Sequence, residues 1–159
     1  MNTTITKEKT ILLSKKGMKE LKKSIQSLEH DHQQALLELH NLDKMSDRDT
    51  RLNHIEKLAK LDIIESQLQD KRMTLANARP LPTKRARMNV AIGSVVDLID
   101  QHGRLFRYML VDSIEANPSD GRISVASPLG KNLIGKTVRD VVEWSTGIKA
   151  NRLQLVHIS

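Results

Sequence analysis

Apolar positions in the first half of the chain recur at alternating spacings of three and four residues. This spacing places side chains on one face of an α-helix and is typical of a coiled-coil seam. Ser14 precedes the series, and its hydroxyl can accept a hydrogen bond from an early backbone N–H of a helix. We therefore predict a long helix that begins after Ser14. Its seam consists of Met18, Leu21, Ile25, Leu28, His32, Ala35, Leu39 and Leu42.

A second seam follows after a polar interval at residues 43–50, whose Asp and Ser residues favour a bend. It consists of Leu61, Ile64, Leu68, Lys71, Leu75 and Ala78, extended towards its start by Ile55 and Leu58 with a local change of phase. Neither seam is apolar enough to be stable alone in water, so the two helices should fold back on each other. An intermolecular coiled coil is the alternative. The short bend between two seams of similar length favours an elongated monomer, with helices roughly 45–50 Å long.

The hydrophobic period changes after the two prolines at positions 80 and 82, which end the second helix. Short β-branched and apolar runs separated by turn residues then predict strands at 90–99, 105–114, 122–126, 138–145 and 153–158. A short helix is expected at 132–135, ended by Gly135. The fold class is therefore α+β. We expect a coiled-coil hairpin at 1–79, a linker at 80–88 and a small antiparallel β domain with one short helix at 89–159.

Composition narrows the possible functions of this chain of 159 residues. The net charge of +7 favours a nucleic acid or an acidic protein surface as partner. There is no cysteine, so disulfides and cysteine-ligated zinc are excluded. The histidines of the first helix lack the i, i+4 spacing of a ligand pair, so we expect no metal held by this chain alone. No apolar run reaches the length of a membrane span, and we expect a cytoplasmic protein with no membrane partner.

One segment carries a specific resemblance. Residues 127–142 read Ser-Pro-Leu-Gly-Lys-Asn-Leu-Ile-Gly-Lys-Thr-Val-Arg-Asp-Val-Val. This run resembles the signature of the C-terminal domain of the bacterial Gre transcript-cleavage factors, roughly S-P-[LI]-G-R-A-L-[IL]-G-K-x-V-G-D-x-V. Glu115-Ala116, Ile123-Ser124 and the start of the first helix also resemble family elements. The resemblance implies an FKBP-like fold for the β domain. Three aromatic residues are too few to line a proline-binding pocket easily, so we expect no isomerase activity.

The resemblance also implies a partner and a site. Gre factors dock their globular domain on bacterial RNA polymerase and insert the hairpin into its secondary channel. Ser127, Pro128 and Leu129 match the loop that is thought to meet the polymerase. Such a factor is no enzyme and needs no cofactor of its own, because acids at the hairpin tip complete the shell of an Mg²⁺ ion in the polymerase active centre. The basic residues Lys44, Arg48 and Arg51 would then lie close to the nascent RNA 3′ end.

The tip departs from the family motif, roughly G-D-x-S-E-N-x-E-Y. Asp47 falls on the first acid, whereas Thr50 falls on the second and Arg51 on the following Asn. Asp47 and Asp49 are the candidate catalytic acids, Asp49 as a rearranged second carboxylate. The same aspartates could instead only shape the bend and cap the second helix. A polymerase-binding cleavage factor is the leading prediction, and a non-cleaving regulator that occupies the channel is the alternative. A coiled-coil adaptor or binder of free nucleic acid is a third interpretation.

Overall fold

The computed structural model describes residues 9–42, 44, 50–82, 88–146 and 148–159. These residues form two compact units. The first unit contains Met18–Ala78, and the second combines Thr10–Gly17 with Arg79–Ser159. The residues that lead into the first helix thus group with the second unit, whereas the sequence suggested that they belong with the hairpin.

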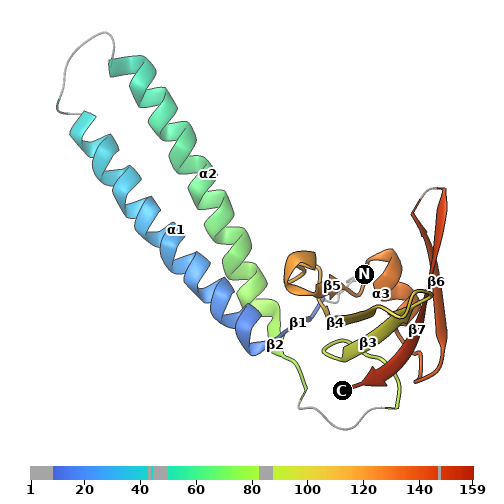
Figure 1. Cartoon of the computed structure of the whole chain (residues 1–159). Helices are drawn as coiled ribbons and strands as arrows, with labels where there is room; N and C mark the ends of the chain where they lie inside the picture. Colours follow the sequence, from blue (N-terminus) through green and yellow to red (C-terminus); the bar gives the residue numbers. More distant parts are fainter. Residues whose placement is uncertain (1–8, 43, 45–49, 83–87, 147) are drawn as a thin grey trace, which may run out of the picture. The chain divides into compact units, whose positions relative to one another are not determined.

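The first unit is built from two long helices (Figure 1). Helix α1 covers Lys15–Leu42 and helix α2 covers Thr50–Asn77, with 28 residues each. At 1.5 Å per residue each helix is about 42 Å long. The predicted cap is confirmed, because Ser14 Oγ accepts a hydrogen bond from the Gly17 N–H at 3.0 Å. Within the residues that the structure describes, no helix combines the length and apolarity of a membrane span.

The two predicted seams are confirmed, apart from one extension. Ile25 and Ala35 of α1, and Ile64 and Leu68 of α2, are buried, and the other predicted seam positions are at least half-buried. The extension to Ile55 and Leu58 is wrong, since these side chains are 63% and 44% exposed. Spacings of three and four, continued back from Leu61 without a phase change, instead reach two half-buried polar residues, Lys57 and His54.

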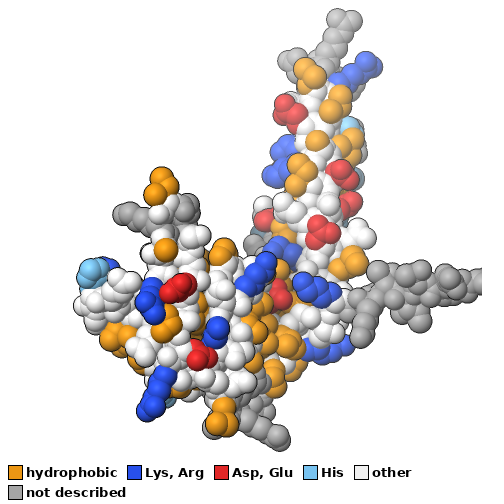
Figure 2. Space-filling model, turned by 90° about the vertical axis from the view of Figure 1, so that its right-hand side faces the viewer, with side chains coloured by type: hydrophobic (Ala, Val, Ile, Leu, Met, Phe, Trp, Pro, Cys, Tyr) orange, Lys and Arg blue, Asp and Glu red, His pale blue; other side chains and the backbone are white. Residues whose placement is uncertain are grey.

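Cross-helix ion pairs supplement this thin seam. The pairs are Glu29–Arg72 (2.7 Å), His32–Glu65 (3.0 Å) and Glu38–Lys57. Residue numbers rise on one helix as they fall on the other, so the pairing is antiparallel. The hydrogen bond from Lys57 lowers the pKa of the Glu38 carboxyl. Charged and apolar side chains are interspersed on the visible face of the hairpin (Figure 2), and exposed pairs of this kind contribute little stability individually.

The second unit is organised around a five-stranded sheet of order β5-β4-β3-β7-β6 (Figure 1). Strands β1 and β2 form a separate two-stranded sheet. The helix α3 and a 3-10 turn, Pro118–Asp120, complete the elements. The bounds are β1 Ile11–Leu13, β2 Ala78–Pro80, β3 Val95–Asp100, β4 Leu105–Val111, β5 Arg122–Ser124, α3 Pro128–Leu133, β6 Val141–Thr146 and β7 Lys149–Ile158.

The sheet departs from the predicted antiparallel arrangement at one edge. Three neighbouring pairs are antiparallel, but β4 and β5 are parallel, with Met109 opposite Arg122. The connection at residues 112–121, which includes the 3-10 turn, leads the chain back so that β5 starts beside Met109 and runs in the same direction as β4. The short helix is also earlier than predicted. Ser127 and Pro128 start it, and Gly135, with φ of 81°, lies beyond its end.

The core of the second unit is aliphatic. Its buried cluster is closed on one face of the sheet by Leu133 of α3, and comprises Val90, Val96, Leu98, Leu110, Ile123, Leu133, Val142, Leu153 and Leu155. The three aromatic residues are only partly buried against this cluster. They line one pocket together.

Candidate functional site

The Ser-Pro-Leu-Gly segment forms the entry to helix α3. Ser127 adopts an extended conformation, with φ of −66° and ψ of 158°, and caps the helix. Its Oγ accepts a hydrogen bond from the Gly130 N–H at 3.0 Å and donates one to the Ser124 carbonyl at 2.7 Å. Pro128 occupies the first turn, where a missing N–H leaves no helical hydrogen bond unmade. The sequence order Ser-Pro therefore encodes a rigid helix start.

Gly130 allows this helix to lie against strand β5. A Cβ atom at this position would overlap the carbonyl oxygen of Ser124 and lie 3.0 Å from the Ser124 carbonyl carbon. Only glycine fits without a shift of the backbone. The close approach brings Leu133 into the core, where its side chain is fully buried. The glycine of the signature thus has a packing role.

The three predicted docking residues lie together at this helix start but differ in exposure. Pro128 is exposed, whereas Ser127 and Leu129 are half-buried. Ser127 serves as the cap, and Leu129 packs against the core. Pro128 is therefore the member of the set that a partner can contact without disturbing the fold. The docking role itself stays a prediction.

The second part of the signature is a tight turn that precedes β6. The Asp140 Oδ2 accepts hydrogen bonds from the Thr137 N–H at 2.8 Å and from its hydroxyl at 3.1 Å. The bond from the backbone N–H, followed by that from the hydroxyl, lowers the pKa of Asp140. Between them Arg139 has φ of 79°, while its N–H donates to the Leu155 carbonyl at 2.7 Å. A positive φ strains an L-residue with a side chain.

Arg139→Gly is therefore expected to stabilise the second unit. Removing the side chain relieves the strain at positive φ, whereas glycine also increases the conformational entropy of the unfolded chain. The first effect should be larger, so the free energy of unfolding should rise by roughly 0.5–1 kcal/mol. Urea unfolding monitored by the fluorescence of Trp144, the single tryptophan, measures the difference. Lys131→Gly is the control, because it places glycine in helix α3 and should destabilise. Equal destabilisation by both variants would contradict the strain at residue 139.

The predicted tip site is only partly within the described residues. Asp47, Asp49 and Arg48 lie outside them, so the structure does not bring the acids together or separate them. Lys44 and Arg51 are described, and both are exposed. Helix α2 begins at Thr50, so Arg51 lies in its first turn. Within the described ranges, no three His, Asp or Glu side chains are grouped as a metal site would require.

Glu115 has a role that sequence reasoning did not identify. Its side chain is only 5% exposed and accepts hydrogen bonds from the N–H of Ser14, at 3.0 Å, and from the Ser14 hydroxyl. Arg122 lies 3.8 Å from its Oε1, which offsets the cost of burying the charge. A Cβ at Gly17 would lie 2.6 Å from the same oxygen. The match at Glu115-Ala116 indicated this position but not its hydrogen-bond partners.

The sequence of the second unit is similar to those of known proteins. Residues 85–159 match the family described as "Transcription elongation factor, GreA/GreB, C-term". GreA of Helicobacter hepaticus is 34% identical over 97 residues, which cover 60% of this chain and 60% of that protein. GreA of Zymomonas mobilis is 45% identical over 56 residues, which cover 35% of each. The chain thus spans about 60% of the length of the first of these relatives.

One solved structure found by comparison is that of GreA factor homolog 1 of Thermus thermophilus. The two sequences are 25% identical. The match covers 95% of this chain and 99% of that one, with a TM-score of 0.43. The family match falls on the domain that contains the capped Ser-Pro-Leu-Gly helix, the residue 137–140 turn and the buried Glu115. Over residues 85–159, this domain therefore matches the C-terminal domain of the GreA/GreB family.

Proposed function

We propose that the protein binds bacterial RNA polymerase as an elongation factor, inserts its hairpin into the secondary channel and stimulates cleavage of backtracked RNA. The observation that supports this best is a GreA/GreB C-terminal domain on the same chain as a hairpin of two 28-residue helices. GreA/GreB factors are accessory factors, and this chain would stimulate the polymerase's own activity. Such a partner implies a cytoplasmic location.

The chemistry would depend on the tip acids. Mg²⁺ prefers carboxylate oxygens, and an added carboxylate stabilises a weakly held second ion in the polymerase active centre. A water bound to that ion is a far better nucleophile than free water. Asp47 would supply the carboxylate, with Asp49 as its partner. The cations Lys44, Arg48 and Arg51 would attract the phosphates of the RNA 3′ end.

The alternative is a factor that occupies the channel without stimulating cleavage. Thr50 stands at the family's second acid position, and the exposed Arg51 follows it. A threonine hydroxyl carries no charge for the metal, and a neighbouring guanidinium repels it. Thr50 and Arg51 therefore favour the alternative, whereas Asp47 favours cleavage.

Both candidates are tested on a stalled, backtracked elongation complex. RNA that is shortened faster than by polymerase alone supports the cleavage factor. Unchanged intrinsic cleavage, combined with inhibition of a GreA that has the full tip motif, supports the channel-occupying regulator. Tight binding to free DNA without binding to polymerase would contradict both and support a nucleic-acid binder.

Docking is tested at Pro128. Pro128→Glu should weaken polymerase binding about tenfold, because it places a charge on the exposed surface of the predicted contact. The fold should be retained, since glutamate is favourable in the first turn of a helix. Pro118→Glu is the matched control, because Pro118 is also exposed and starts a helical turn. Equal affinity of both variants, measured by fluorescence anisotropy of labelled protein, would contradict this docking site.

A further inference from the structure

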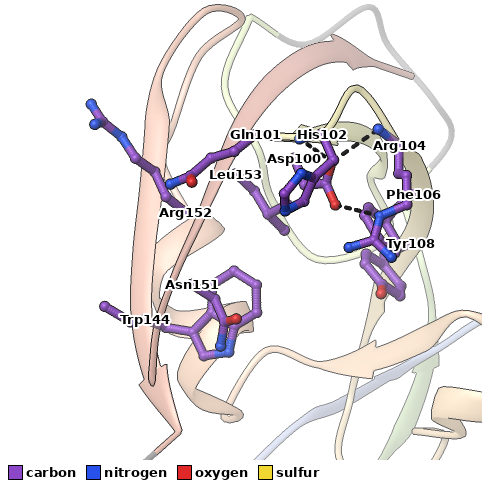
Figure 3. Close-up of a pocket in the computed structure, with 11 residues that line it drawn as sticks. Asp100, Gln101, His102, Arg104, Phe106, Tyr108, Trp144, Asn151, Arg152 and Leu153 are labelled. Atoms are coloured by element: carbon purple, nitrogen blue, oxygen red, sulfur yellow. Dashed lines mark hydrogen bonds and ion pairs between the residues drawn. The ribbon is translucent and has the colours of Figure 1, made fainter. Parts of the chain in front are cut away.

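All three aromatic residues of the chain line one pocket of the second unit. Phe106 and Tyr108 come from β4, and Trp144 comes from β6. The cavity has a volume of about 320 Å³, and Leu153 of β7 lies at its wall between the two sides (Figure 3). The pocket belongs entirely to this unit, and none of the residues matched to the Gre signature lines it.

The exposure of these rings is unexpected for a domain of this size. Aromatic side chains bury the largest areas and usually dominate a core. Here the fully buried side chains are leucines and valines, while the three rings stay partly accessible at the edge of the cluster. Their shared position at a cavity is typical of a binding site.

The rings are arranged on opposite sides of the cavity. The Phe106 and Tyr108 rings are stacked on one strand, with centroids 6.3 Å apart and planes at 7°. Trp144 projects from the other side (Figure 3). Strands β4 and β6 are separated by β3 and β7, which corresponds to about 14 Å along the sheet. A flat group that enters the cavity therefore meets aromatic side chains from strands on both sides of it.

Two guanidinium groups lie at the rim. Arg104 is held in place, because its N–H and Nε–H donate to the Asp100 carboxylate at 2.9 and 2.7 Å. Its guanidinium carbon lies 6.0 Å from the Phe106 ring centroid. Arg152, on the Trp144 side, is 3.3 Å from Glu143 and is 58% exposed. A guanidinium has five donors, so pairing with one carboxylate leaves capacity for a phosphate.

We propose that this pocket binds a nucleotide, with its base between Trp144 and the Phe106–Tyr108 pair and its phosphate at Arg104 or Arg152. Aromatic faces combined with arginines are typical of sites for unpaired bases. Ligand pockets range over about 300–1,000 Å³, so 320 Å³ suits one nucleotide better than a length of peptide. The source is either a single strand or a free nucleotide. The proposal does not depend on polymerase binding.

The single tryptophan makes the test direct. The full chain is titrated with uridine monophosphate and, separately, with an eight-nucleotide oligouridine, and Trp144 fluorescence is recorded. Stacking of a base should quench the emission with saturation at one site. Phe106→Leu should weaken binding about tenfold, and Arg152→Gln should reduce its salt dependence. Lys131→Gln is the control, since it removes one charge from an exposed residue of α3 outside the pocket and should bind like the wild type.

The pattern of Trp144 quenching by the two ligands distinguishes the possible occupants of the pocket. Quenching by the oligonucleotide alone assigns the pocket to a single strand, and quenching by both assigns it to any nucleotide. Absence of saturable quenching by either overturns the proposal, as does equal binding by Phe106→Leu and wild type. If Phe106→Leu lowers the melting temperature, the proposal is tested with Arg152→Gln instead, because Arg152 is exposed. Unchanged salt dependence of nucleotide binding in this variant would then overturn the proposal. Loss of polymerase affinity in Phe106→Leu, without nucleotide binding by wild type, would assign the pocket to a protein partner and overturn the proposal.

Discussion

Replacing Gly130 by alanine is expected to lower the free energy of unfolding of the second unit by about 3 kcal/mol or more. The added methyl group would overlap the Ser124 carbonyl oxygen, which belongs to the backbone and has no room to move. Helix α3 must then shift away from β5 and withdraw Leu133 from the core. Urea unfolding followed by Trp144 fluorescence reports on this unit.

The control for this variant is Gly103→Ala. Gly103 has φ of 76°, but none of the described atoms lies within 4 Å of the position that an added methyl group would take, so alanine there adds backbone strain without overlap. Its cost should be about 1–2 kcal/mol. A Gly130→Ala variant that is no less stable than Gly103→Ala would show that α3 can move freely, and would contradict the packing role of the signature glycine.

Asp47→Ala is expected to abolish any stimulation of RNA cleavage. Asp47 alone keeps a family acid position, and Asp49 is a rearranged second carboxylate, so Asp47→Ala removes the best-placed group for the second Mg²⁺. Stimulated cleavage by the wild type should depend more steeply on Mg²⁺ concentration than that of a GreA with both acids. Gel analysis of RNA in a backtracked complex measures the rate, and polymerase affinity measured in parallel should stay unchanged.

Thr50→Glu tests the same site by gain of function. It restores a carboxylate at the family's second acid position and should raise the cleavage rate about tenfold or more. Asp49→Ala should have a smaller effect than Asp47→Ala. If the wild type cleaves no faster than polymerase alone and Thr50→Glu changes nothing, the cleavage function is excluded. The channel-occupying regulator then becomes the better account.

The hairpin could be predicted well because its signal is local and periodic. Spacings of three and four residues identified both seams and both helices, and Ser14 identified the start of α1. The predicted extension of the second seam to Ile55 and Leu58 was wrong because it followed apolar residues and gave up the regular spacing of three and four. In a rod of two helices, geometry requires the positions of Lys57 and His54 to face the partner helix whatever their polarity.

The β domain was predicted in outline, while its non-local features were not. Each strand has a local signal, but the parallel pairing of β4 with β5 depends on how residues 112–121 lead the chain back to the same direction beside β4. The hydrogen bonds of Glu115 involve Ser14, about one hundred residues earlier, and no periodic pattern encodes them. The aromatic pocket likewise depends on side chains from β4 and β6 that meet only in the folded sheet.

The composition of the hairpin seam has a consequence for how the rod opens. The half of α2 near Ala78 is held by buried apolar residues, Ile64 and Leu68 among them, whereas the half near Thr50 presents Lys57 and His54 to α1. Buried apolar contacts raise the free energy of local opening far more than exposed ion pairs do. We therefore expect the two helices to separate most readily near Glu38 and Lys57, and the buried Ile64 and Leu68 to resist further separation along α2.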